Sequence, residues 1–160
     1  MMSAMATLLT ALSVVATGLY AGFMLIFLTG VMPALGRLAD EQFVAAMRRV
    51  NEDVPRGVFV SVMLASVAFP AAALAVPGDD GRPAAQWILL AAGLGLVVLN
   101  HLVTIAGNIP LNNALAASER TGAVDREVRA AFETRWNRLH LVRTLLATAG
   151  FVLVVGGSLS

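Results

Sequence analysis

The segment NHLVTIAGNIPLNN, residues 100–113, decides the architecture that the sequence predicts. It begins inside an uninterrupted apolar run and ends on a proline flanked by asparagines. On one helix, His101, Thr104 and Asn108 occupy positions i, i+3 and i+7 and share a face. Because hydrocarbon penalises unsatisfied polar groups, this face must point toward other helices or a cavity. The segment therefore predicts a membrane helix bundle with a polar interior.

The last apolar region of the chain carries a second polar stripe. Trp136, His140 and Arg143 are spaced i, i+4 and i+7, which places them on one face of a helix. A histidine or an arginine inside a membrane helix usually faces the bundle interior or a water-filled path. We therefore expect the functional site to lie between this stripe and the first one.

Composition places the chain among membrane proteins rather than soluble ones. The length suits one domain, residues 1–160. Hydrophobic residues make up 58% and charged residues 13% of the chain, against about 25% charged in an ordinary globular protein. The net charge of +1 gives no basis for nucleic-acid binding. Cysteine is absent, which excludes disulfides, iron–sulfur clusters and thiolate metal sites.

Four apolar runs are long enough to cross a bilayer, so we expect an all-α integral membrane protein, a four-helix transmembrane bundle. The expected spans cover about residues 4–32, 57–77, 84–107 and 139–158. Charged residues 37–56 predict a short interfacial helix after the first span, and residues 114–138 predict a cytoplasmic extension of the fourth helix. The sequence PGDDGRP, residues 77–83, predicts a tight polar turn.

Pro110 predicts an interruption of the third span. A proline disfavours helical geometry at the residue before it, so the helix is expected to end or break near Asn108. The side-chain amides of Asn108, Asn112 and Asn113 can cap the backbone groups that such a break exposes. The same amides, beside a polar stripe, are also candidates for binding a substrate.

The distribution of arginines predicts the topology, since lysine is absent. The loop after the first span holds four arginines and the loop after the third holds five, whereas the loop after the second holds only Arg82. The positive-inside rule places both arginine-bearing loops in the cytoplasm and both termini outside the inner (plasma) membrane. The uncharged N-terminal stretch lacks the basic region of a secretory signal, so we expect a retained membrane helix.

The two histidines leave several chemical roles open. His101 can be a structural residue, an acid or base, or a ligand of a metal or haem. His101 and His140 together are compatible with a bis-histidine haem, whereas zinc and di-iron spacings such as HExxH are missing. Arg143 can reach toward the interface or, if it faces inward, can bind an anion or an enolate.

Four segments spread over nearly the whole chain carry a family resemblance. They are GFMLIFLTGVMPAL (22–35), MRRVNEDV (47–54), TIAGNIPLNNAL (104–115) and FETRWNRLHLVRT (132–144). With these segments the chain resembles the anthrone-oxygenase-like integral membrane proteins. The third is the most specific, since the family pattern is a GN-x-PLN segment leaving the third helix. The fourth matches a pattern of tryptophan, then asparagine or histidine, then arginine, here Trp136, His140 and Arg143.

The resemblance implies a four-helix membrane bundle. It also implies, from characterised members, oxygenation of anthrone to anthraquinone by molecular oxygen without an organic cofactor. An anthrone has an acidic methylene whose carbanion is stabilised as an enolate, so the protein needs only a base, an oxyanion site and an apolar pocket. His140 or His101 would be the base and Arg143 the enolate partner. The expected substrate-binding residues are Asn51, Thr104, Asn108, Asn112, Asn113 and Trp136.

We therefore expect a membrane oxygenase that acts on a polycyclic phenol, an anthrone or a quinol-like aromatic such as an aromatic polyketide. The alternative is a non-catalytic membrane protein, as a monomer or a homo-oligomer. In that case it binds a lipid, a quinone or a haem, or it scaffolds a partner. A visible spectrum separates these readings, because a bis-histidine haem gives a Soret band.

Overall fold

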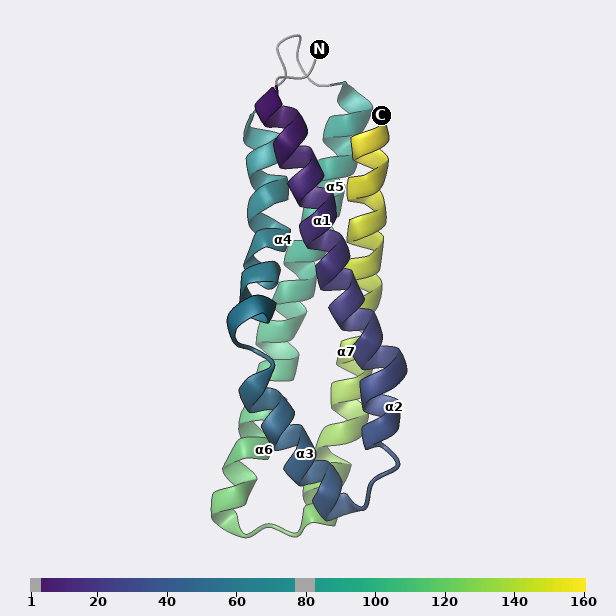
Figure 1. Cartoon of the computed structure of the whole chain (residues 1–160). Helices are drawn as coiled ribbons and strands as arrows, with labels where there is room; N and C mark the ends of the chain where they lie inside the picture. The colour runs from purple at the N-terminus through teal and green to yellow at the C-terminus, as the bar shows by residue number, and fades with distance from the viewer. Residues whose placement is uncertain (1–3, 77–82) are drawn as a thin grey trace.

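The computed structural model describes residues 4–76 and 83–160, so nearly all of the turn expected at 77–83 lies outside the described residues. Every regular element within them is helical, and four long rods run side by side (Figure 1). The elements are α1 (Ala4–Ile26), η1 (Phe27–Val31), α2 (Met32–Leu35), α3 (Asp40–Asp53), α4 (Gly57–Ala75), α5 (Ala84–Val103), η2 (Thr104–Asn108), α6 (Ile109–Thr121) and α7 (Asp125–Leu159). The first rod consists of α1, η1 and α2, and the second is α4. The third rod consists of α5, η2 and α6, and the fourth is α7.

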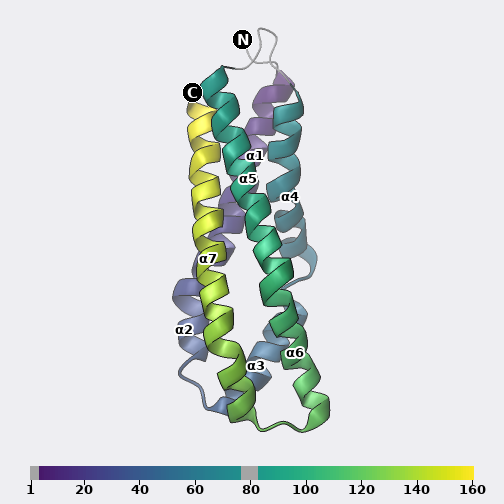
Figure 2. The same cartoon turned by 180° about the vertical axis from the view of Figure 1, so that it is seen from behind.

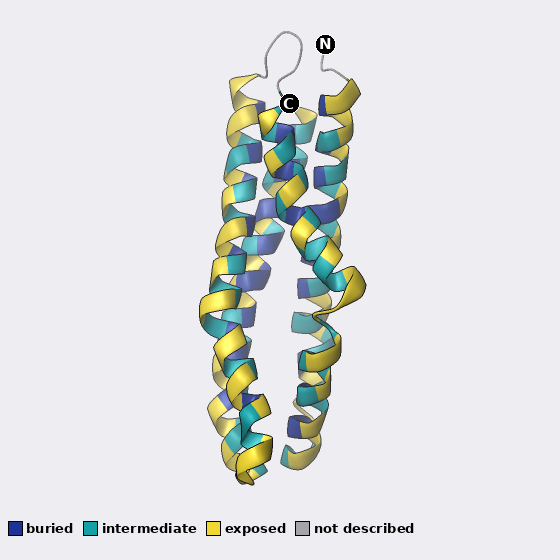
Figure 3. Cartoon of the chain, turned by 90° about the vertical axis from the view of Figure 1, so that its left-hand side faces the viewer, coloured by how far each residue is buried: buried dark blue, intermediate teal, exposed yellow. Residues whose placement is uncertain are grey.

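The four rods are long and apolar enough to cross a membrane, as the sequence predicts. Buried residues face the bundle axis, whereas the outer faces are exposed (Figure 3). Those outer faces carry large apolar side chains, including Leu19, Leu64, Ile105 and Val152. Apolar faces of this extent suit lipid rather than water. The predicted all-α fold with four candidate membrane-spanning helices is therefore confirmed.

Glycines bring α5 and α7 into close contact. A Cβ added at Gly93 would lie 2.8 Å from Val154 Cγ2 and 2.9 Å from the carbonyl oxygen of Gly150. Small residues of this kind let membrane helices approach until their backbones touch. The contact sets the register of α7 against α5, and with it the relative height of the polar groups on the two helices.

Replacing Gly93 by alanine is expected to lower the thermal midpoint of the protein in detergent. The added methyl group forces the two helices apart, and overpacking of this kind costs about 1–3 kcal/mol. Gly95→Ala on the same helix is the matched control, because a Cβ there meets nothing within 4 Å. Melting followed by circular dichroism checks both variants. Equal midpoints would show that the α5–α7 contact does not limit stability.

α3 lies across the lower ends of α6 and α7 (Figure 2) and confirms the short helix expected after the first span. Its apolar face enters a core at this end of the bundle. The fully buried members of that core are Met32, Phe43, Val44, Met47, Leu115, Phe132 and Trp136. Trp136 of the α7 stripe belongs to this core, so the core adjoins the region that carries His140 and Arg143.

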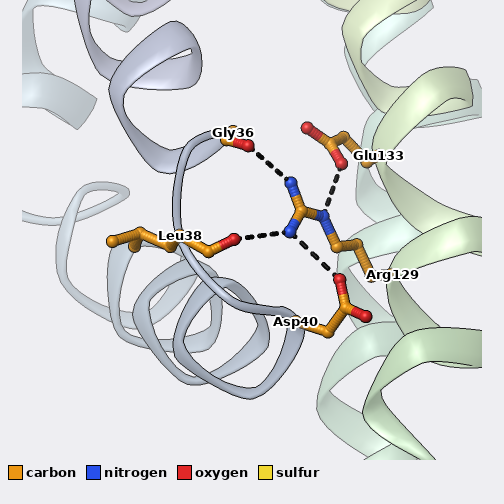
Figure 4. A network of polar contacts seen from close by, with 5 residues as sticks. All are labelled: Gly36, Leu38, Asp40, Arg129 and Glu133. Atoms are coloured by element: carbon orange, nitrogen blue, oxygen red, sulfur yellow. Dashed lines mark hydrogen bonds and ion pairs between the residues drawn. The ribbon is translucent and has the colours of Figure 1, made fainter.

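Arg129 of α7 forms hydrogen bonds to the turn between α2 and α3 (Figure 4). Its Nη2 donates to the carbonyl oxygen of Gly36 at 2.9 Å, and its Nη1 donates to that of Leu38 at 2.8 Å. The same guanidinium pairs with Asp40 at 3.1 Å and with Glu133 at 2.7 Å. Arginine suits this role because its planar fork binds several acceptors at once. The start of α3 is thereby fixed against α7.

The helix break expected near Asn108 does not occur. α5 continues through the π-helical turn η2 into α6, and Ile109 has helical angles of φ −60° and ψ −46°. The Ile109 N–H bonds to the carbonyl oxygen of Thr104, five residues back, and Pro110 lies in the first turn of α6. A proline is tolerated there because its missing N–H has no required partner, and the wider turn leaves room for its ring. The π turn η1 precedes Pro33 in the same way.

The charged segment before the last span is helical. α7 runs without interruption from Asp125 to Leu159, so the extension of the fourth helix is confirmed for residues 125–138, whereas residues 114–121 belong to α6. α6 ends at Thr121, where Gly122 adopts a left-handed conformation with φ 63°. Glycine reaches this region without the steric penalty of a side chain, which lets the chain turn back toward α7.

Candidate functional site

A cavity of about 350 Å³ lies within the bundle, lined by residues of α1, the end of α3, α4, α6 and α7 together with the two π turns. Its volume is in the range of pockets that hold small organic molecules. Most of the lining side chains are apolar or aromatic. Seven of the residues predicted from the sequence line it, namely Asn51, Thr104, Asn112, Asn113, Trp136, His140 and Arg143.

The stripe on α7 forms one wall of the cavity, as its spacing predicts. The indole of Trp136 stacks on the imidazole of His140, with ring centroids 4.8 Å apart and 22° between the planes. The guanidinium of Arg143 lies 5.6 Å from the centre of the same indole. All three side chains are buried. The wall therefore joins a flat aromatic surface to a cation.

His140 has two hydrogen-bond partners, of which one is an acceptor and the other a donor. Its Nε2 lies 3.1 Å from the carbonyl oxygen of Met24 on α1, and its Nδ1 lies 2.9 Å from Nη2 of Arg143. A carbonyl only accepts and a guanidinium only donates, so the ring carries its hydrogen on Nε2 and presents a lone pair at Nδ1. His140 is thus a neutral imidazole whose basic nitrogen faces the arginine.

Arg143 is a buried cation without a carboxylate partner. Its side chain is 7% exposed, and none of the ion pairs among the described residues includes it. Its Nη1 donates to Oγ1 of Thr104 at 3.1 Å, and its Nε has no hydrogen-bond partner. A buried charge normally has a counter-ion, because desolvation without one is costly. The arrangement is typical of a site that receives its anion from a ligand.

His101 does not line the cavity with the other candidates. Its Nε2 lies 3.2 Å from the carbonyl oxygen of Met63 on α4, and its ring lies 5.1 Å from that of Tyr20 on α1. Its Nδ1 is buried without a partner. The structure therefore places His101 at the contact of α1, α4 and α5, and separates it from His140.

Asn100, which the two-stripe interpretation missed, faces α7 in place of His101. It accepts a hydrogen bond from the hydroxyl of Tyr20 at 2.8 Å and donates to the backbone oxygen of Arg143 at 2.5 Å. Thr104 Oγ1 donates to the Asn100 carbonyl at 3.0 Å. The spacing i, i+4 and i+8 of Asn100, Thr104 and Asn108 was a signal for this face. Tyr20 is the only tyrosine of the chain, and its place in an uncharged span was a second signal.

Asparagines of the third rod bind α7 rather than cap a helix end. Nδ2 of Asn108 donates to the backbone oxygen of Trp136 at 3.4 Å, which buries Asn108 behind the cavity wall. Oδ1 of Asn112 accepts the indole N–H of Trp136 at 2.9 Å. Asn113 lines the cavity and is exposed. The GNIPLNN segment therefore positions Trp136 from two sides.

The donor set does not fit a bis-histidine haem. Axial ligation needs a free lone pair on each imidazole. Nε2 of each histidine donates to a backbone carbonyl, and Nδ1 of His140 already accepts from Arg143. The remaining nitrogen, Nδ1 of His101, belongs to a residue outside the cavity lining. Among the described residues, no three His, Cys, Asp or Glu side chains gather into a possible metal site.

One comparison with known proteins identifies the family of this chain. The family model described as anthrone oxygenase matches residues 43–153, which include α3, the third rod and the site-bearing part of α7. Neither a curated protein nor a solved structure matches the chain. The match covers more than half of the sequence and contains the cavity residues from Asn51 to Arg143. The chain belongs to the anthrone oxygenase family.

Proposed function

We propose that the cavity binds a planar polycyclic phenol of the anthrone type and catalyses its oxygenation by molecular oxygen, without an organic cofactor. The observation that carries this proposal is the buried guanidinium of Arg143, which has no carboxylate partner among the described residues and lies beside a stacked indole and imidazole. A phenolate or enolate oxygen supplies the missing negative charge, and the fused rings suit the aromatic walls.

The chemistry begins with a proton transfer to His140. Its Nδ1 takes a proton from the acidic methylene carbon of the substrate, and the electron pair delocalises onto the carbonyl oxygen as an enolate. Arg143 stabilises that oxyanion, and the surrounding apolar cavity strengthens the attraction because little water screens it. A general base of this kind contributes about 10²–10⁴-fold to the rate.

Arg143 controls when Nδ1 of His140 can accept a proton. In the structure its Nη2 occupies the lone pair of His140 Nδ1. The carbonyl oxygen of the substrate, which becomes the enolate oxygen, competes for the same guanidinium, so substrate binding frees Nδ1 before the proton is accepted. The positive charge formed on the imidazole then lies beside an arginine whose charge the substrate neutralises. Base activation and substrate binding are therefore coupled through one hydrogen bond.

Oxygen completes the reaction without an added reductant. The enolate passes one electron to O₂, and the resulting radical pair combines to form a carbon–oxygen bond. The peroxide takes the proton from His140, and loss of the second methylene hydrogen with cleavage of the O–O bond gives the ketone and water. Anthrone and O₂ thereby give anthraquinone and one water, and the substrate is the only species oxidised.

Oxygen uptake by the purified protein tests the proposal. The protein in detergent, treated with a chelator and free of added cofactors, is given anthrone, and O₂ consumption and anthraquinone formation are followed together. Arg143→Met in the same detergent provides the background from spontaneous oxidation. Equal uptake by the two proteins would contradict an enzymatic function. Saturable binding of anthrone without uptake would instead favour the binding protein considered as the alternative.

We also propose that the lower end of the bundle in Figure 1 faces the cytoplasm, in the inner (plasma) membrane. The α2–α3 and α6–α7 connections lie together at that end, and they belong to the arginine-bearing regions of the sequence. The first residues of α1 and the end of α7 lie at the opposite end (Figure 1). The positive-inside rule therefore supports external termini. A C-terminal reporter that is active only outside the cytoplasm tests this orientation.

A further inference from the structure

Asn51 presents a buried polar group that no contact of the protein explains. It lies near the end of α3 and lines the cavity, and its amide nitrogen is buried without a hydrogen-bond partner. A buried donor without a partner is rare in folded proteins because its loss of hydration is not compensated. Such a group beside a cavity indicates a ligand atom that accepts its hydrogen bond.

The position of Asn51 is fixed by the residues before it on α3. Met47, one turn earlier, is fully buried in the core against α7. Arg48 donates to the backbone oxygen of Leu115 at 3.1 Å and to the hydroxyl of Ser118 at 2.8 Å, which anchors α3 on α6. The amide of Asn51 is therefore held at the cavity by a rigid helix rather than by a loose side chain.

Among the described residues that line the cavity, the buried side-chain polar atoms without a partner are both donors. Nε of Arg143 and Nδ2 of Asn51 lack partners. Asn112 uses its oxygen to accept from the indole of Trp136, which leaves its amide NH₂ as the group that it can offer. None of the lining residues is an aspartate or a glutamate. The cavity therefore matches a ligand that carries oxygen acceptors and no cationic group.

The three donors come from three different helices. The guanidinium of Arg143 on α7 lies over the ring of Trp136, the amide of Asn112 on α6 meets the Nε1 edge of that ring, and Asn51 lines the cavity from α3. A fused-ring ligand with two oxygens supplies one acceptor to Arg143 and a second acceptor to Asn51.

We propose that Asn51 is a specificity-determining residue whose amide donates a hydrogen bond to a second oxygen of the substrate, distinct from the oxyanion held by Arg143. The inference rests on the proposed oxygenation, and it restricts the preferred substrates to anthrones that carry a further hydroxyl or carbonyl on a terminal ring. Unsubstituted anthrone is accepted less well, because the buried amide then stays unpaired while the ligand excludes water.

The test compares three anthrones as substrates of the wild type and of two variants. Anthrone, 2-hydroxyanthrone and 3-hydroxyanthrone are given to the wild type, to Asn51→Leu and to Asn137→Leu, whose asparagine is on α7 outside the cavity lining. In the wild type, we expect the better hydroxyanthrone to exceed anthrone in kcat/KM by about tenfold, the usual effect of one completed hydrogen bond. In Asn51→Leu, we expect the ratio of kcat/KM for the hydroxyanthrone to that for anthrone to fall to about one, whereas Asn137→Leu retains the preference.

Binding of the matching anthraquinones, followed by tryptophan fluorescence, separates this inference from the proposed reaction. Preferential binding of a hydroxyanthraquinone that Asn51→Leu abolishes supports the role of Asn51 even if no oxygen is consumed. Oxygen consumption with an unchanged preference in Asn51→Leu overturns that role and leaves the oxygenation intact. Circular dichroism of both variants checks that they are folded, which separates loss of preference from unfolding.

Discussion

Replacing Arg143 by methionine is expected to abolish most oxygen uptake while leaving the bundle folded. The loss in kcat/KM should be about 10²–10³-fold, the usual effect of removing a principal oxyanion partner. The thermal midpoint is expected to stay near that of the wild type, because the variant removes a buried charge that has no carboxylate partner. Initial rates of O₂ consumption and thermal melts of the same preparation check both statements.

Arg138→Met is the matched control for this variant. Arg138 is an exposed arginine on α7, outside the cavity lining, so its loss should leave oxygen uptake unchanged. Arg143→Lys should recover only part of the activity, since an ammonium lacks the planar fork that reaches Nδ1 of His140 and Oγ1 of Thr104 together. Wild-type rates in Arg143→Met would remove the guanidinium from the mechanism.

Replacing His140 by glutamine is expected to lower kcat by about 10²–10⁴-fold, the contribution of a general base. The substitution is chosen because an amide oxygen can accept from Arg143 while the amide NH₂ donates to the backbone oxygen of Met24, so both structural hydrogen bonds have a replacement. A carboxamide cannot take up the methylene proton. Initial rates of O₂ consumption with anthrone, corrected for spontaneous oxidation, check this loss.

The rate of His140→Gln separates catalysis from structure. Wild-type rates in this variant would show that His140 only links Arg143 to α1. His101→Gln serves as the control, because His101 is not among the lining residues, although its partners Met63 and Tyr20 are. It should keep the wild-type rate. Loss of activity in His101→Gln alone would assign the base to His101 instead.

The sequence predicted the α7 wall correctly because helical period is a local property. Trp136, His140 and Arg143 come together on one unbroken helix, and no neighbouring element needs to be known to group them. The same reasoning fails at the third span. The π turn η2 inserts an extra residue into the helical period, so residues after it are rotated relative to those before it.

That rotation explains why His101 and Asn108 are not on the same face of the helix. The face toward α7 runs through Asn100, Thr104 and Asn108, while His101 turns toward α4. A proline inside a regular α-helix removes a backbone hydrogen bond and clashes with the preceding turn. Either a break in the helix or a wider turn relieves this clash. The choice depends on packing against α7, which one segment by itself does not contain.

By itself, the sequence determined that the chain is a helical bundle with four apolar rods, and which polar residues share the face of α7. These properties follow from composition and from the period of a single helix. Only the tertiary structure decided that Arg143 has no carboxylate partner, that His140 presents Nδ1 to it, and that the Asn51 amide is unpaired. Each of these is a relation between side chains on different helices, or between a side chain and the space around it. Such relations exist only once the helices have packed.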